Sequence, residues 1–330
     1  MAPPLIVMRF DAGRAVGMGH AVRSVALAQA LAARGARVAI AANAAGQAVV
    51  RGAAPDMAWP MCAARTPLTL RRAWSGCDAL IVDSYALGHG FERACRGWAK
   101  RIVVIDDLPT RRHDCDLLLD QTLGRRPAEY RGLVPIRAMI LAGRRYALLR
   151  PAFLETRRSL RRRFRADDRR ILVTLGGGDQ SARLDALLGA APRRTPPLSI
   201  TALGRPGRAA RRAGVEAVAG DFGVALRFAA ADLAISAAGS TAWEMSCLGL
   251  PMVLLPIAAN QRDVAASLAR RGVAVRVAAG DPAGAWRAAL ALLANPGRRR
   301  AMSEKGRAFI DGAGARRAAD AILALIGGRR

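Results

Sequence analysis

The sequence predicts an α/β protein made of two similar halves, each a parallel sheet covered by helices on both faces, with a cleft between them. Short apolar runs rich in Val, Ile and Leu alternate with longer Ala- and Leu-rich segments of helical spacing, as in buried parallel sheets. The alternation pauses near residue 150 and restarts near residue 170, which predicts domains at residues 1–150 and 151–330. A chain of 330 residues that is 52 % hydrophobic is long enough for two cores.

The elements follow from apolar runs and from the glycines and prolines that interrupt them. In the first half we expect strands at residues 5–11, 37–41, 79–83, 101–105 and 117–120, and helices at residues 21–33 and 91–99. In the second half we expect strands at residues 170–175, 198–203, 217–218, 233–236 and 252–255. Helices are expected between these strands and from residue 282 to the end, and the segment around Pro55, Pro60 and Pro67 is expected to be loose.

The formal charge of +27 comes almost entirely from arginine, because lysine occurs only at Lys100 and Lys305. The arginines are scattered, and no aromatic residues alternate with them to stack on bases. We therefore interpret the charge as a general preference for arginine that favours small anionic substrates, and we expect no nucleic-acid partner. The densest run, at residues 157–163, is interpreted as a solvated connector between the halves.

The cysteines predict neither a disulfide framework nor a zinc site, because their number is odd and no two form a C-x-x-C pair. They are Cys62, Cys77, Cys95, Cys115 and Cys247. No apolar run reaches the ~20 residues of a membrane span, and no signal-like segment precedes the first strand. We expect a cytoplasmic monomer without stable membrane insertion, without a metal and without another cofactor.

The first strand, the loop that follows it and the next helix form the first candidate site. Gly17 and Gly19 allow the backbone to turn sharply and to approach a ligand closely. The helix start supplies free N–H groups and a positive dipole end, which suit phosphate. His20 stands at this helix start, and a histidine can take a proton from water or a hydroxyl near neutral pH.

Three further residues of the first half are candidates. Arg23 lies one helical turn after His20 on the same face. Asp11 follows the first strand and either orients His20 or a substrate hydroxyl, or caps the loop. Tyr85 follows another strand and either donates to a phosphate or sugar, or only lies at the edge of the core.

Other polar residues of this half have simpler interpretations. His89 and His113 lack metal-like spacing and are interpreted as surface histidines. Asp106 and Asp107 are interpreted as turn residues.

The strongest signal of the second half is a helix start with small and hydroxyl-bearing residues. Gly239, Ser240 and Thr241 place two hydroxyls where backbone N–H groups can bind a diphosphate. Glu244 lies one turn further on, where its carboxylate could accept hydrogen bonds from a ribose diol. The same spacing, from Thr241 to Glu244, is also that of a capping box, which needs no ligand.

Two more segments of the second half could contact a ligand. Gly176, Gly177 and Gly178 either turn backbone amides toward phosphate or form a plain tight turn. Asn260 and Gln261 could bind a sugar or the edge of a base, although Asn260 could instead cap the helix that begins there.

Together the two halves resemble the GT-B architecture of two Rossmann-like domains, and more narrowly the PseG family. The matching motifs occur in order over roughly residues 5 to 265 and are specific only in combination. They are Arg9-Phe10-Asp11, Gly17-Met18-Gly19-His20-Ala21-Val22-Arg23, Asp83-Ser84-Tyr85, residues 113–120, residues 146–150, Ala237-Ala238-Gly239-Ser240-Thr241 with Glu244, and Asn260-Gln261.

PseG proteins are UDP-sugar hydrolases of pseudaminic acid biosynthesis, which supplies flagellin glycosylation, and they resemble MurG in fold. The resemblance implies that His20 activates a water that attacks the anomeric carbon of UDP-2,4-diacetamido-2,4,6-trideoxy-β-L-altropyranose with inversion. It implies that Asn260 and Arg150 contact sugar or phosphate, and that UDP leaves without a metal. The sequence departs from the family at Ser84, where a His is common, and at Ala12 and Gly13, where polar residues are common. These departures concern the sugar more than the hydrolysis, and the alternative is a MurG-like UDP-sugar glycosyltransferase of surface polysaccharide synthesis.

Overall fold

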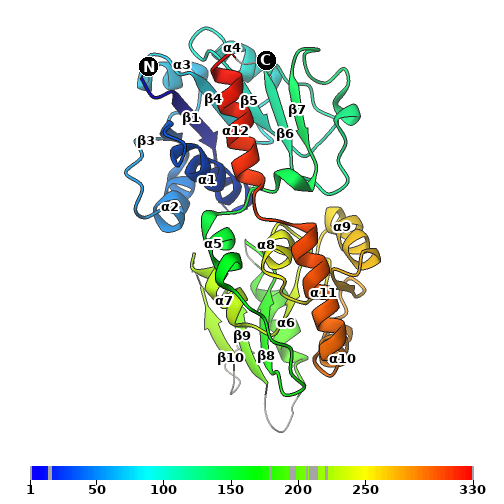
Figure 1. The fold of residues 1–330 in the computed structure, drawn as a ribbon. Coiled ribbons are helices and arrows are strands. Elements are labelled where there is room, and N and C mark those ends of the chain that lie inside the picture. The colour runs from blue at the N-terminus through cyan, green and yellow to red at the C-terminus, as the bar shows by residue number, and fades with distance from the viewer. Residues whose placement is uncertain are drawn as a thin grey trace. The chain divides into compact units, whose positions relative to one another are not determined.

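The computed structural model describes residues 2–13, 17–177, 180–192, 198–205, 207, 215–219 and 222–328, except the side chain of Asn260. It divides the chain into two compact units, Met1–Pro151 with Gly312–Arg330, and Ala152–Asp311. Each unit contains one parallel sheet with helices on both faces, which confirms the predicted fold class of two Rossmann-like halves (Figure 1).

The first unit has a seven-stranded parallel sheet in the order β3-β2-β1-β4-β5-β6-β7. Its strands are β1 (Leu5–Phe10), β2 (Arg37–Ala41), β3 (Met61–Cys62), β4 (Ala79–Asp83), β5 (Ile102–Ile105), β6 (Leu117–Asp120) and β7 (Met139–Ala142). Its helices are α1 (Gly19–Ala32), α2 (Ala44–Ala53), α3 (Pro67–Ala73), α4 (His89–Cys95) and α12 (Gly314–Ile326), with 3₁₀ turns η1 (Pro127–Tyr130) and η2 (Arg144–Tyr146).

Both faces of this sheet are buried, which explains the continuous apolar strands. On one face Leu70 of α3, Cys95 of α4 and Tyr130 of η1 pack on the strands. On the other face lies α1, with α2 and α12 beside it. The register places Phe10 at the end of β1 opposite Asp83 at the end of β4.

The last helix belongs to the first unit, although the division of the sequence at residue 150 had placed it in the second half. The buried residues of α12, such as Ala318 and Ile322, form one face of the helix, and α12 packs on α1 and η2. Arg34, which follows α1, forms an ion pair with Asp320. An amphipathic helix is stable where its apolar face is covered, and α1 provides that cover.

The second unit has a six-stranded parallel sheet in the order β10-β9-β8-β11-β12-β13. Its strands are β8 (Arg170–Thr174), β9 (Ser199–Leu203), β10 (Val215–Val218), β11 (Leu233–Ser236), β12 (Met252–Leu254) and β13 (Val275–Arg276). Its helices are α5 (Pro151–Ser159), α6 (Ser181–Gly189), α7 (Val224–Ala230), α8 (Thr241–Leu248), α9 (Ala259–Arg270), α10 (Pro282–Leu293) and α11 (Pro296–Phe309).

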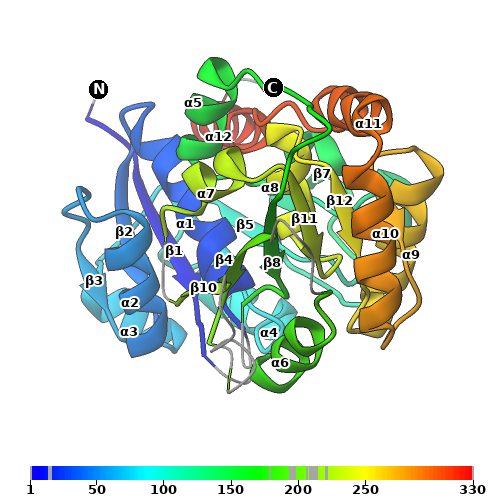
Figure 2. The ribbon, with the colours of Figure 1, turned by 90° about the horizontal axis from the view of Figure 1, so that it is seen from below.

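The core of this unit lies where α6 and α10 cover one face of the sheet. Leu187 and Trp286 are both buried there, and the Trp286 indole Nε1 donates to the Leu187 carbonyl at 2.7 Å. Figure 2 shows α7 and α8 on the other side of β8 and β11, and α8 packs against α11.

The arginine-rich segment at residues 157–163, which covers the end of α5 and the residues after it, is not a solvated connector. Arg157 donates to the Cys247 carbonyl at 2.6 Å. Arg162 donates to the carbonyls of Phe228 and Leu248, at 2.6 and 2.9 Å, near the ends of α7 and α8. The last carbonyls of a helix lack partners within the helix and carry its negative dipole end, so a guanidinium stabilises them. These arginines therefore hold helix ends of the second unit.

Most expected elements are present, but several short or edge elements were not predicted. The strands β3 and β13 have two residues each, too few for a recognisable run. The edge strand β7 has four apolar residues, although its first residue, Met139, is exposed, and it is not among the strands expected from the sequence. The segment expected to be loose contains α2 and α3, which begin after Asn43 and Thr66, where both side chains cap the helix.

Candidate active site

The candidate catalytic groups of the first unit lie at the carboxyl ends of β1, β4 and β5. The order of the sheet runs outward from β1 in one direction and from β4 in the other. In open parallel sheets this reversal leaves a crevice where ligands bind. The chain places His20 there, at the start of α1, next to Asp83 at the end of β4.

His20 pairs with Asp83, and this is the central contact of the site. The Nδ1 atom of His20 hydrogen bonds to Asp83 Oδ1, and His20 is only 5 % exposed. Arg23 donates to the same carboxylate through Nε at 2.8 Å and Nη2 at 2.6 Å, and Ser24 Oγ donates at 2.9 Å. Asp83 is thus held by three residues of one helix.

The surroundings keep Asp83 ionised. Burial alone would raise the pKa of Asp83, but the charge of Arg23 and the hydrogen bonds from Arg23 and His20 outweigh burial and lower this pKa. An ionised carboxylate beside Nδ1 requires that Nδ1 carries a proton. In the neutral form of His20 the lone pair is then on Nε2, which is the arrangement of a general base.

Tyr85 and Asp107 extend this network. The Tyr85 hydroxyl donates to Asp107 Oδ1 at 2.6 Å, and Arg23 donates to Asp107 Oδ2 at 3.2 Å. The Tyr85 ring meets the His20 ring edge to face, with 4.5 Å between centroids. Burial, followed by the bond to Asp107, raises the pKa of Tyr85, so the hydroxyl stays protonated. Asp107 is therefore part of the site and not only a turn residue.

Asp11 shapes the loop after β1 and does not orient His20. Its carboxylate accepts from Arg9 at 2.8 Å and from the backbone N–H of Asn43 at 3.0 Å. Although burial raises the pKa of Asp11, the hydrogen bond and charge of Arg9 hold it below its usual value. The contact with His20 that was expected of Asp11 is made by Asp83, which was named from the sequence only within the motif Asp83-Ser84-Tyr85.

The two glycines of this loop, Gly17 and Gly19, differ in backbone conformation and in role. Gly17 has φ +79°, a left-handed conformation that favours glycine, and its backbone pairs with Gly13. Gly19 has no such φ, and a Cβ there would meet nothing within 4 Å. The fold therefore requires Gly17, whereas the open space at Gly19 leaves room for a ligand.

His113 is buried, not on the surface, in contrast to His89, which is exposed as expected. Its Nδ1 lies 2.7 Å from Glu92 Oε1 and its Nε2 lies 2.7 Å from Asp106 Oδ2. Both ring nitrogens face carboxylates, so both must donate. Burial alone would lower the pKa of His113, but the hydrogen bonds to Asp106 and Glu92 and their charges raise it to about 9.

This cluster predicts a loss of stability at alkaline pH. The folded-state pKa of His113 lies above its usual 6.5, so its stabilising contribution is complete below pH 6.5 and is lost as pH rises through about 9. We expect the free energy of unfolding from urea titrations to fall over this window. His113→Gln, which does not titrate, should lower stability at pH 6 and flatten the fall. An equally steep fall in the variant would assign the titration to other groups.

In the second unit the candidate residues gather at the carboxyl ends of the adjacent strands β8, β11 and β12. Gly176 and Gly177 follow β8 and are exposed, and Gly176 has φ +85°. Gly178 lies outside the described residues. Because β8 and β11 mark the reversal of strand order in this sheet, these glycines and the start of α8 flank the crevice where ligands bind in such sheets.

The start of α8 is open to a ligand. Ser240 is exposed and is the N-cap, and among the described residues the hydroxyls of Ser240 and Thr241 make no hydrogen bond. The first helical residue is Thr241, so the capping box expected between Thr241 and Glu244 does not form. A Cβ on Gly239 would meet nothing within 4 Å. In the described part of the chain, no hydrogen bond uses the backbone N–H groups of Gly239, Ser240 and Thr241, and unpaired N–H groups at a helix start suit an anion.

The remaining candidates have different positions. Gln261 Oε1 accepts from the backbone N–H of Ile257 at 3.0 Å and so holds the loop after β12. The helix α9 begins at Ala259, so Asn260 is not its N-cap, and the Asn260 side chain lies outside the described structure. Arg150 is buried at the end of the first unit.

Neither a metal-binding cluster nor a membrane-spanning helix occurs in the part of the chain that the structure describes. No group of three His, Cys, Asp or Glu side chains is placed to hold a metal ion. No described helix combines the length and the hydropathy needed to cross a membrane.

The fold is that of known GT-B enzymes. No protein-family model matches the sequence, and no curated protein matches it. The structure is similar to the glycosyltransferase of kitacinnamycin, with a TM-score of 0.63, 19 % identity and coverage of 98 % of this chain and 99 % of that one. It is also similar to MurG of Acinetobacter baumannii, with a TM-score of 0.61, 16 % identity and coverage of 97 % and 99 %.

A third similar structure is a putative UDP-N-acetylglucosamine 2-epimerase from Listeria monocytogenes, with a TM-score of 0.67, 13 % identity and coverage of 100 % of this chain and 98 % of that one. These similarities extend over the whole chain. They establish that the chain has the GT-B fold of two Rossmann-like domains.

Proposed function

We propose that the protein is a UDP-sugar hydrolase of the PseG type, which releases UDP from UDP-2,4-diacetamido-2,4,6-trideoxy-β-L-altropyranose. The observation that carries this proposal is the pair of His20 and Asp83 at the β1–β4 crevice of the first unit. The two residues present a nitrogen lone pair at the carboxyl ends of the strands, where such folds bind ligands.

The reaction is a displacement at the anomeric carbon. Nε2 of His20 takes a proton from water as the water oxygen forms a bond to that carbon on the face opposite UDP. The bond between the carbon and the phosphate oxygen breaks, and UDP leaves with the electron pair. Attack opposite the leaving group inverts the configuration. Asp83 remains ionised and stabilises the imidazolium that forms.

The nucleotide is assigned to the second unit. The turn at Gly239, Ser240 and Thr241 offers backbone N–H groups, two hydroxyls and the dipole of α8 to the diphosphate. Glu244, one turn further, is assigned to the ribose diol, and Gly176 and Gly177 border the same crevice. Negative charge develops on the diphosphate as UDP leaves, so these groups also favour departure.

Gly239→Ala tests the nucleotide assignment. A Cβ at this position meets nothing in the protein, so we expect the free energy of unfolding to change by less than about 0.5 kcal/mol. We expect UDP binding, measured by calorimetry, to weaken at least about tenfold, because the Cβ would occupy the space of the diphosphate.

Gly249→Ala is the matched control at the other end of α8. Gly249 has φ +63°, and its Cβ would lie 2.5 Å from Ser303 Oγ, so this change should destabilise the fold by more than about 1 kcal/mol. Unchanged UDP affinity in Gly239→Ala would remove the diphosphate from this turn.

A UDP-sugar glycosyltransferase is the second candidate, because MurG and the kitacinnamycin glycosyltransferase share the fold. The two reactions differ in whether water or an alcohol attacks. We expect UDP to be released from the proposed substrate in the absence of an acceptor. If folded protein binds UDP but releases none under these conditions, the transferase or another sugar is the better assignment.

A further inference from the structure

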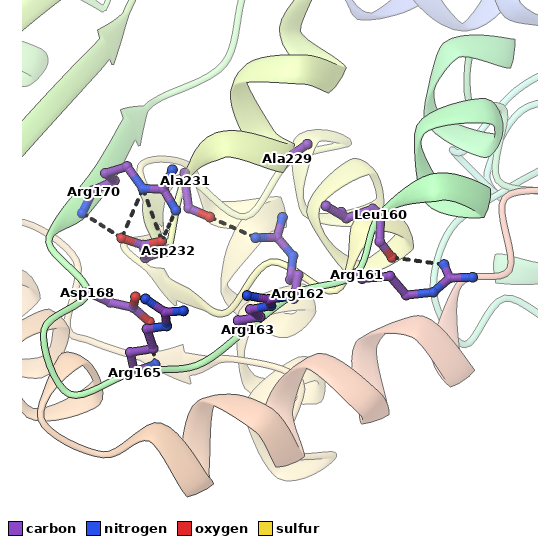
Figure 3. Close-up of a pocket in the computed structure, with 10 residues that line it drawn as sticks. All are labelled: Leu160, Arg161, Arg162, Arg163, Arg165, Asp168, Arg170, Ala229, Ala231 and Asp232. Carbon is purple, nitrogen blue, oxygen red and sulfur yellow. Dashed lines mark hydrogen bonds and ion pairs between the residues drawn. The ribbon is translucent and has the colours of Figure 1, made fainter.

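We propose that the second unit carries a separate binding site for a phosphate-bearing anion, formed by two adjoining arginine-lined cavities at the amino ends of β8 and β11. The cavities have volumes of about 260 Å³ and 720 Å³ and share Leu160, Arg161 and Arg162. The smaller one is also lined by Arg170, at the start of β8, and by Asp232, directly before β11 (Figure 3). The glycines assigned to UDP lie at the opposite, carboxyl ends of the same strands.

Exposed and half-buried residues alternate along the segment that lines both cavities. Residues 160–165 form no helix, and Arg161, Arg163 and Arg165 are exposed whereas Arg162 is half-buried. Arg162 points toward Ala231, to whose carbonyl it donates at 2.7 Å. Arg162 therefore anchors the segment, whereas Arg161, Arg163 and Arg165 remain exposed to solvent.

Among the described residues, the positive charge that lines these cavities exceeds the negative charge. Nine arginines and three acidic residues line the two cavities. Asp232 pairs with Arg170, and Asp168 pairs with Arg299, which lines neither cavity. Within the described residues, the guanidinium groups of Arg163 and Arg165 have no acidic partner. Figure 3 shows Arg165 near Asp168, but the contact between them is a hydrogen bond from the backbone N–H of Arg165 to Asp168 Oδ2 at 2.9 Å.

Like charges at this site repel one another. Burial, followed by the charges of Arg157 and Arg161, lowers the pKa of Arg307. Burial also lowers the pKa of Arg162 to about 10; the charge of Asp232 opposes this fall, and the charges of Arg307 and Arg170 add to it. A bound anion would relieve this repulsion, and guanidinium groups bind phosphate oxygens through paired hydrogen bonds.

Apolar side chains favour a phosphate group that is attached to something larger. Leu154, Leu160 and Phe164 line the larger cavity together with the arginines. A phosphate ester with an apolar neighbour fits both kinds of lining. The phosphate oxygens that the arginines would bind occur both in free polyphosphates and in the headgroups of anionic phospholipids, of which only the phospholipid adds an apolar part. The experiment below distinguishes the two.

The test compares two double variants of the full chain that remove the same charge. Arg163→Gln with Arg165→Gln changes the proposed site, and Arg71→Gln with Arg72→Gln changes exposed arginines of α3 as the control. Binding of inorganic pyrophosphate is measured by calorimetry with saturating UDP. Binding to phosphatidylglycerol and phosphatidylcholine vesicles is measured by flotation, and melting temperatures verify that each variant folds.

We expect the first variant to bind at least about tenfold more weakly than wild type, because hydrogen bonds to charged groups contribute about 1.5–3 kcal/mol each. The control should stay within about twofold, as expected for charges far from the ligand. Pyrophosphate binding that is weakened in the first variant and kept in the control supports a free-phosphate ligand. If pyrophosphate does not bind and phosphatidylglycerol binding is weakened only in the first variant, the ligand is a lipid. Equal loss in both variants, binding of neither probe, or binding only of duplex DNA in a parallel assay overturns the proposal.

Discussion

Replacing His20 with alanine is expected to slow UDP release from the proposed substrate by about 10²–10⁴, the usual contribution of a general base. His20 is held by Asp83 at a strand end, so its removal deletes the proton acceptor and leaves the fold of α1 intact. Alanine is also the best helix former, so it suits the start of α1. UDP release without an acceptor is the measurement, and UDP binding should be unchanged.

The partner of His20 can be tested with a change of one functional group. Asp83→Asn removes the charge that keeps the proton on Nδ1, so we expect a loss of about the same size as for His20→Ala. Asp11→Asn makes the same substitution at the end of the neighbouring strand, where the carboxylate contacts Arg9 instead of His20. If Asp11→Asn lost as much activity as Asp83→Asn, the assignment of Asp83 as the orienting residue would be wrong.

Replacing Arg299 with alanine is expected to destabilise the second unit by about 3–5 kcal/mol, the range for removing one partner of a buried ion pair. Arg299 is fully buried, pairs with Asp168 at 2.5 Å, and donates to the carbonyls of Leu292 and Leu293 at the end of α10. Its loss leaves these acceptors unsatisfied and creates a cavity. Thermal and urea unfolding of the second unit measure the effect, and the spectroscopic signals of the first unit should stay intact.

Arg298→Ala is the matched control, because the two residues are neighbours on α11. Arg298 is exposed, and only its backbone N–H takes part in the cap of that helix, so its side chain should matter by less than about 0.5 kcal/mol. Equal destabilisation by the two substitutions would show that the buried guanidinium does not hold α10.

The sequence by itself determined the class of fold and the turns at which ligands are expected to bind. Parallel strands buried on both faces must be apolar along their whole length, so runs such as residues 79–83 are recognisable without any partner. His20 and Gly239 were recognisable for a similar local reason, because each stands where a loop enters a helix. The backbone chemistry of a helix start depends on neighbouring residues only.

The tertiary structure alone decided which side chains meet. Asp83 lies 63 positions from His20, and only the pairing of β1 with β4 brings it to the start of α1. His113 was interpreted as a surface residue, since only the fold reveals Glu92 and Asp106 on either side of it. A charged histidine can be buried where acidic partners pair with it. For His113 this pairing depends on three segments of the chain, those that carry His113, Glu92 and Asp106.

The arginines show the same limit most clearly. Arg298 and Arg299 are adjacent and identical in chemistry, yet one is in solvent and the other is fully buried. Successive residues of a helix are rotated by about 100° around its axis, so two neighbours can face different surroundings. Likewise α12 is an amphipathic helix whose partner the sequence did not identify, and its apolar face packs on α1 of the first unit. Local pattern determines which elements form, whereas the free energy of burial, summed over distant segments, decides where they pack.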